Sequence, residues 1–161
     1  MERRIDRVTI RTARADDVPA LVSLINRAFA VEKFIDGTRT DEERFSETMH
    51  KGTLLVAERG GEAIACVYVE LRGERAYFGM LAVDPARQHQ GLGRSMTTAA
   101  ENFGRNHGCK HMDISVLSLR PELLPLYRNL GYSEIGTEEF HPTRPLKGGV
   151  QCHCIVMSKA L

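Results

Sequence analysis

Two glycines separated by one residue stand where a predicted strand passes into a predicted helix. They are Gly91 and Gly93, within the segment Leu81 to Arg94. Unpaired backbone N–H groups at a helix start, with the positive end of the helix dipole, favour a phosphate or a pyrophosphate. Because neither glycine has a β-carbon, an anion could touch the backbone there, and Arg94 or His89 could add positive charge. The turn therefore predicts a site for a phosphorylated ligand.

A lone Gly-x-Gly also occurs in turns that are purely structural. Two familiar phosphate motifs do not fit this turn. The dinucleotide fingerprint requires a third glycine where this chain has Met96, and the P-loop requires Gly-Lys-Ser/Thr. On the residues alone, a phosphate site and a structural turn of an unrelated α/β protein both remain open.

Apolar periodicity and turn residues predict seven strands and four helices around this turn. Asp16 is expected to cap the first helix, and Thr40, with Glu43 three residues later, the second. The order β-α-α-β-β-β-α-β-α-β-β predicts an α/β (α+β) fold with a mixed, mostly antiparallel sheet flanked by the helices. We expect residues 1–161 to form a single domain. The expected strands are 8–10, 53–58, 62–72, 75–83, 110–117, 132–140 and 151–158, and the later helices begin at Leu92 and Pro121.

Two segments together resemble the GNAT superfamily of N-acetyltransferases. Gln88-His89-Gln90-Gly91-Leu92-Gly93 is similar to the family pattern Gln/Arg-x-x-Gly-x-Gly/Ala, and the preceding strand end, Leu81 to Pro85, usually accompanies it. The segment Leu126 to Tyr132 resembles the family's Leu-Tyr-x-x-x-Gly-Phe/Tyr, and its Tyr127 lies 34 residues after Gly93. The resemblance extends over nearly the whole chain.

The resemblance implies acetyl-CoA as co-substrate and no metal. In such proteins the pantetheine arm lies between two strands, which here are expected to splay apart after Leu81, while amides at the helix start hold the pyrophosphate. Arg120 departs from the family, since many members carry a cofactor-binding Asn at that place. The implied cofactor-binding residues are Leu81, Ala82, Val83, Gln88, His89, Gln90, Gly91, Leu92, Gly93, Arg94 and Ser95.

The reaction that the resemblance implies is direct attack of a primary amine on the thioester, with Tyr127 protonating the departing thiolate. On ordinary pKa values of about 10 and about 8.5, this proton transfer is uphill by about 2 kcal/mol. Tyr127 could instead be a packed aromatic with its hydroxyl at a wet edge. A non-catalytic acyl-CoA-binding or regulatory domain is the alternative function.

The general base is less clear, because Tyr77 stands where histone-type members have a glutamate. Glu70 is the only acid in the apolar stretch from Ala63 to Leu71, so a buried carboxylate with a raised pKa is one candidate. A solvated Glu70 and a water relay are the alternatives. Asp36 and the connector Phe140 to Gly149 are in places that often line the acceptor site of such enzymes.

Composition limits the partners. Lys and Arg number 22 against 21 Asp and Glu, which gives no support for nucleic acid. No apolar run approaches the roughly 20 residues of a membrane span, and the start has no signal peptide, so we expect a cytoplasmic protein without a membrane partner. On a strand, Cys152-His153-Cys154 would point the thiols away from the histidine, which disfavours a metal site. A peptide or small-molecule amine acceptor and a homodimer are the remaining expectations.

Overall fold

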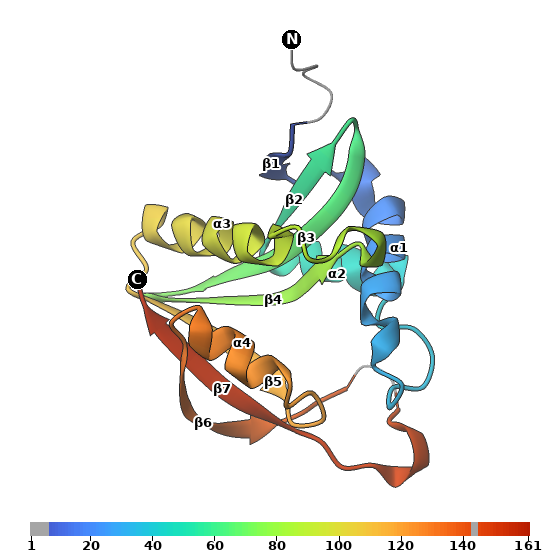
Figure 1. Cartoon of the computed structure of the whole chain (residues 1–161), viewed down its shortest axis with the longest axis vertical. Helices are drawn as coiled ribbons and strands as arrows, with labels where there is room; N and C mark the ends of the chain where they lie inside the picture. Colours follow the sequence, from blue (N-terminus) through green and yellow to red (C-terminus); the bar gives the residue numbers. More distant parts are fainter. Residues whose placement is uncertain (1–6, 143–144) are drawn as a thin grey trace.

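A computed structural model describes residues 7–142 and 145–161. Within these residues, a seven-stranded sheet has the order β1-β2-β3-β4-β5-β7-β6, and β4 and β5 are its parallel pair. The order of helices and strands is the predicted one (Figure 1). The elements are β1 (Thr9–Thr12), α1 (Val18–Ala28), α2 (Glu42–Lys51), β2 (Thr53–Arg59), β3 (Glu62–Arg72), β4 (Arg75–Val83), α3 (Leu92–Asn106), β5 (His111–Leu117), α4 (Leu123–Asn129), β6 (Ser133–Glu139) and β7 (His153–Ala160).

The sheet buries a different core on each face because successive strand residues point to opposite sides. Cys66 and Tyr68 of β3 pack with α1 and α2, whose buried residues include Ile25 and Phe45. Val67 of β3 belongs to the other core, which contains the apolar side of α3 and part of α4. The long apolar run of β3 is therefore explained by helices on both faces.

The sheet opens between its two parallel strands. Pairing of β4 with β5 covers only three positions and ends at Tyr77 and Asp113. The strands lie together near the C-terminal end of the chain and then diverge (Figure 1). The expected point of divergence, after Leu81, was wrong, because the strands part four positions earlier on β4, after Tyr77.

A β-bulge in β4 shapes the opening. The pairing of β3 with β4 passes from Tyr68↔Gly79 to Cys66↔Ala82, so β4 carries one residue more than β3 across this step. Met80 lies within it and has a positive φ of 50°. A bulge bends its strand and re-aims its side chains, so this irregularity turns the end of β4 away from the direction set by its first residues.

The caps of the first two helices lie one residue later than predicted. Asp16 lies in a 3₁₀ turn before α1, and the residue at the cap position is Asp17. Thr40 does not cap α2, because its amide and carbonyl both bond to the side chain of Asn26, at 2.9 and 3.0 Å. The next residue, Asp41, takes the cap and accepts a hydrogen bond from the Arg44 amide at 3.0 Å.

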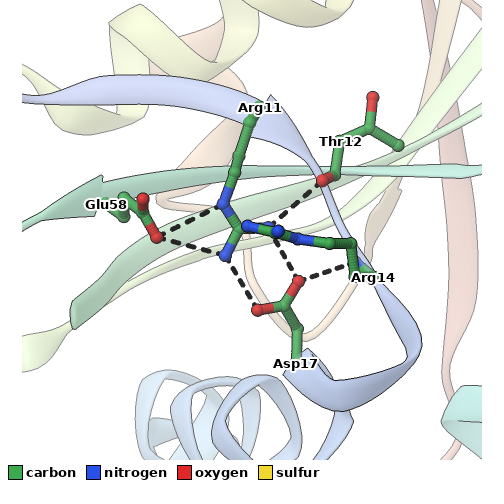
Figure 2. Close-up of polar contacts among 5 residues, drawn as sticks. All are labelled: Arg11, Thr12, Arg14, Asp17 and Glu58. Carbon is green, nitrogen blue, oxygen red and sulfur yellow. Dashed lines mark hydrogen bonds and ion pairs between the residues drawn. The ribbon is translucent and has the colours of Figure 1, made fainter. Parts of the chain in front are cut away.

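A network around Arg11 joins the first strand to its neighbours (Figure 2). The guanidinium donates to both carboxylate oxygens of Asp17, at 2.7 and 2.8 Å, and to Glu58 of β2 at 3.1 and 3.2 Å. The Asp17 carboxylate also accepts the Arg14 amide at 2.6 Å. The hydrogen bonds from Arg11 are the main cause that lowers the pKa of Asp17 to about 2.

We predict that Arg11→Gln lowers the free energy of unfolding by about 1–2 kcal/mol at pH 7, as expected for part-buried charged hydrogen bonds. Because Asp17 has a lowered pKa in the folded chain, its contribution is complete above pH about 4 and is lost as the pH falls towards about 2. The difference in free energy of unfolding between Arg11→Gln and the unaltered protein should therefore become smaller over that pH range. Urea unfolding between pH 7 and pH 3 measures it, with Arg105→Gln as the control. An equal deficit at both ends would contradict this assignment.

Candidate active site

The space between the diverging strands is a cavity of about 430 Å³. Its walls come from β4, β5, the turn before α3, the helix α4 and the segment that follows α1. It thus brings together parts of the chain that are far apart in sequence. Its lining residues are Ala28, Phe29, Glu32, Arg39, Tyr77, Phe78, Gly79, Met80, Leu81, Val83, Arg87, Gln88, His89, Gly91, Leu92, Gly93, Ile114, Ser115, Val116, Leu117, Arg120, Leu123, Leu126 and Tyr127.

The start of α3 presents free amides to this cavity. The first hydrogen bond of the helix runs from the Ser95 amide to the Gly91 carbonyl at 3.0 Å, so the three amides before Ser95 have no acceptor within the helix. Gly91 has φ 78° and a β-carbon at position 91 or 93 would meet no atom within 4 Å. This open space beside unpaired N–H groups fits a pyrophosphate.

Only some of the cofactor-binding residues that the resemblance implied line the cavity. Ala82 faces the core under α1, and Gln90, Arg94 and Ser95 are absent from the cavity lining. The Ser95 amide is used within the helix, so it is not free to hold a phosphate. Arg87, which sequence reasoning missed, lines the cavity and is held by Glu62 at 3.0 Å. The residues that do line the cavity are Leu81, Val83, Gln88, His89, Gly91, Leu92 and Gly93.

Tyr127 lines the same cavity as the start of α3. Its ring packs against Phe78, with 6.2 Å between centroids, and against Tyr132 at 6.1 Å. The Tyr132 hydroxyl in turn donates to the buried Glu101 at 2.8 Å, which fixes this aromatic cluster. Burial raises the pKa of Tyr127 to about 12, so its hydroxyl carries its proton at neutral pH.

Glu70 does not have the properties that its prediction as a base required. Its carboxylate accepts the Tyr68 hydroxyl at 2.7 Å and the Arg72 guanidinium at 2.9 Å. The bond from Arg72 is the largest cause that lowers, rather than raises, the pKa of Glu70. Glu70 is also absent from the cavity lining, because the residues of β3 are separated from the cavity by β4. The expected raised pKa was therefore wrong.

Sequence reasoning missed a buried acid that joins two arginines at the cavity wall. Glu32 is 6% exposed, and its two carboxylate oxygens accept Arg39 at 3.1 Å and Arg120 at 2.9 Å. Arg120 also bonds to Glu122 at 2.6 Å. Arg120 lies 88 residues after Glu32 in the chain, so no spacing could have indicated this contact. Arg120, where the resemblance implied an asparagine, is held by carboxylates of the protein itself.

Tyr77 also lines the cavity. A β-carbon at Gly79 would lie 2.7 Å from the Tyr77 hydroxyl, so the glycine makes room for this side chain. Burial raises the pKa of Tyr77, so it stays protonated at neutral pH. A neutral phenol therefore occupies the place at which histone-type members of the family have a glutamate.

Within residues 7–142 and 145–161, no three or more His, Cys, Asp or Glu side chains are grouped as metal ligands. Cys154 is buried and His153 is exposed, as expected for neighbours on a strand. No helix in this part of the chain is long and apolar enough to cross a membrane.

The fold is similar to those of solved acetyltransferases. The ribosomal-protein-S18-alanine N-acetyltransferase from Escherichia coli aligns with a TM-score of 0.78 at 22% identity, over 96% of this chain and 94% of that chain. A GNAT family acetyltransferase from Elizabethkingia anophelis, with acetyl-CoA bound, aligns with a TM-score of 0.75 at 20% identity, over 97% and 99% of the two chains. A comparison with curated proteins found no match.

At these identities the solved structures establish the fold alone. The sequence itself matches a family, however, and the match covers residues 18–132, which include α1, the turn before α3 and Tyr127. The two motifs lie inside this range and open on one cavity. The chain therefore belongs to the acetyltransferase (GNAT) family, and it is an acetyl-CoA-dependent N-acetyltransferase.

Proposed function

We propose that this protein transfers the acetyl group of acetyl-CoA to a primary amine by direct attack, with Tyr127 as the general acid. The observation that carries the proposal is that the free amides at the start of α3 and the side chain of Tyr127 belong to one cavity. An anchor for the cofactor and a proton donor for its sulfur can therefore act on the same molecule.

The anchor is the backbone around Gly91. The amides of Leu92, Gly93 and Arg94 donate to the pyrophosphate, and the helix dipole adds to the attraction. Arg87 and His89 stand beside this place in the cavity wall. Beyond Tyr77, β4 has no strand partner on its β5 side, so we assign its backbone groups near Leu81 and Val83 to the pantetheine arm.

Acetyl-CoA supplies an acyl group that is activated by a thiolate leaving group. A backbone N–H near Leu81 donates to the acyl oxygen as negative charge gathers there. The acceptor nitrogen forms its bond to the carbonyl carbon, the carbon–sulfur bond breaks, and Tyr127 gives its proton to the sulfur. The acceptor nitrogen loses its extra proton to water, and Tyr127 takes a proton back from solvent before the next turnover.

The pKa of Tyr127 limits this step. A phenol of pKa about 12 giving its proton to a thiolate of ordinary pKa about 8.5 is uphill by about 5 kcal/mol. Burial, however, raises the pKa of a thiol as well, and in this chain it raises that of Cys66 to about 12. Desolvation of the sulfur beside Tyr127 raises its pKa in the same direction, which makes the transfer less uphill.

The lining of the cavity does not supply an obvious base for the acceptor. Glu32 is its acid, and both of its oxygens are bonded to arginines. We assign the removal of the amine proton to water, so the acceptor must arrive neutral. Glu70 is not part of this proposal.

Gly91→Asp should weaken the binding of coenzyme A by at least about tenfold, because it puts a carboxylate beside the free amides. Isothermal calorimetry measures this affinity. The matched control is Gly108→Asp at the other end of α3, where φ is +81° and a β-carbon also meets nothing within 4 Å. The two variants carry the same backbone strain and charge. Equal affinities in both would show that the cofactor does not use the start of α3.

Tyr127→Phe should retain coenzyme A affinity and lower kcat by at least about tenfold, the lower end of what an acid catalyst contributes. Thiol release from acetyl-CoA with a panel of primary amines measures it. Tyr132→Phe is the control, since it removes a hydroxyl from the same aromatic cluster whose partner is Glu101. Unchanged turnover in Tyr127→Phe would remove Tyr127 from the mechanism. Tight cofactor binding without thiol release for any amine would instead favour a binding or regulatory domain.

The pH dependence of kcat/KM should show a rise with pH and no fall. Because only the neutral amine attacks, kcat/KM should increase with pH up to the pKa of the acceptor amine. Since the pKa of Tyr127 is about 12, loss of its proton should cause no decrease below pH about 10. A decrease that begins near pH 8, with the protein still folded by circular dichroism, would contradict this assignment.

A further inference from the structure

A second cavity, of about 180 Å³, adjoins the first. Arg39 and Met80 line both cavities, and Met80 directly precedes Leu81 on β4. The second cavity therefore lies next to the part of β4 that we assign to the acyl group. Its other lining residues are Ile35, Thr40, Arg44, Thr48, Phe140, His141 and Pro142.

The wall of this second cavity is basic. Arg39 and Arg44 contribute two guanidinium groups and His141 an imidazole, and none of the described lining residues is acidic. Thr40 and Thr48 also line it, but their hydroxyls donate to the backbone carbonyls of Asp41 and Arg44, which leaves the two arginines as the donors for a ligand. Arginine is the side chain best suited to hold a carboxylate, because its planar fork can donate two parallel bonds.

Arg44 has a donor without an acceptor. Its Nη1 is buried and has no hydrogen-bond partner within the described part of the chain. Its Nε lies 3.7 Å from the Asp41 carboxylate, which is longer than a hydrogen bond, and that carboxylate also caps α2. A buried donor without an acceptor is unfavourable. Because Nη1 itself has almost no accessible surface, it meets an acceptor atom of a ligand in this cavity when the guanidinium turns towards it.

Arg39 is held in place with donors to spare. Its Nη1 bonds to Glu32, whose other oxygen is taken by Arg120, and its guanidinium lies over the Phe29 ring at 4.9 Å. A guanidinium has five N–H donors, so the remaining ones can face a ligand. Arg39 is thus fixed between the two cavities.

The far wall of the second cavity is tied to the rest of the molecule. Ile35 pairs with Leu146, the Asp36 amide donates to the Pro145 carbonyl at 2.9 Å, and the Lys147 amide donates to Phe34 at 2.8 Å. These bonds hold the loop after α1, including Ile35 of the cavity wall, against residues 145–147 of the connector.

We propose that the second cavity binds a carboxylate of the acceptor, so that the amines acetylated by this protein are amino acids or other amines that carry a carboxylate. Arg44 and Arg39 hold the carboxylate while the amine reaches the first cavity past Met80. The inference rests on the proposed function and specifies its substrate class.

The test compares matched acceptors with the unaltered protein. Each ω-amino acid from glycine to 6-aminohexanoate is paired with its own amide, which keeps the amine and removes the charge, and an Ala-Asp dipeptide with Ala-Asn serves as the peptide arm. At one or more lengths, kcat/KM for the carboxylate should exceed that for the amide by at least about tenfold, as expected for charged hydrogen bonds. A preference for Ala-Asp over Ala-Asn, without a preference in the amino-acid pairs, would identify the acceptor as an acidic peptide.

Turnover of amides and carboxylates at equal kcat/KM would overturn the inference and leave the proposed function standing. No turnover of any acceptor would call for calorimetry on the complex with coenzyme A. Binding of a carboxylate there, but not of its amide, would support the second cavity independently of catalysis, and no binding would overturn it. Loss of coenzyme A binding as well would count against the proposed function.

Arg44→Gln should abolish the preference for the carboxylate while leaving the KM for acetyl-CoA and kcat/KM for the amides unchanged. Arg105→Gln, which removes the same charge from the exposed end of α3, should keep the preference. Arg44→Lys retains the positive charge but lacks the two parallel N–H donors of the guanidinium, so it should lose part of the preference for the carboxylate. This variant tests the role of Arg44 if Arg44→Gln does not fold. An equal loss of kcat/KM for a carboxylate acceptor and for its amide would assign Arg44 a structural role only.

Discussion

The parting of β4 from β5 is the constraint on which the rest of the structure depends. A buried backbone amide or carbonyl without a partner is unfavourable, so strands of a sheet normally remain paired along their length. Here the pairing ends at Tyr77 and Asp113, and the edges beyond them border a cavity. The bulge at Met80 bends β4 at this level, with the strain of a positive φ at a residue other than glycine. A site that exposes strand edges is suited to a ligand that resembles a peptide, as the amide-containing pantetheine arm does.

The electrostatics of the cavity follow from the same opening. Positive potential comes from backbone amides at the start of α3 and from arginines at the wall, whereas the buried acid Glu32 is committed to Arg39 and Arg120. The two cavity-lining phenols, Tyr77 and Tyr127, have raised pKa values because they are buried. The cavity therefore favours anionic groups and keeps its phenols protonated. This combination suits a cofactor with phosphates, a leaving thiolate and an acceptor that brings its own negative charge.

The order of elements and the place of the cofactor turn could be predicted because they depend on local patterns. Gly91 and Gly93 sit at a strand-to-helix junction that periodicity locates, and Tyr127 follows from the second motif. Features that depend on tertiary contacts could not be predicted from the sequence. Thr40 looks like a cap in sequence, but Asn26 of another helix occupies its backbone. Glu70 looked like a buried acid, but its neighbour Arg72 lowers its pKa. The contact of Glu32 with Arg120, 88 residues later in the chain, leaves no mark on sequence spacing, and neither does the unpartnered Nη1 of Arg44.

A crystal structure of this protein with coenzyme A bound would show whether the start of α3 holds the cofactor. We predict pyrophosphate oxygens at roughly 3 Å from the amides of Leu92, Gly93 and Arg94, and a sulfur atom within reach of the Tyr127 hydroxyl. A pyrophosphate held by side chains away from the start of α3, or a sulfur on the far side of the cavity from Tyr127, would contradict it.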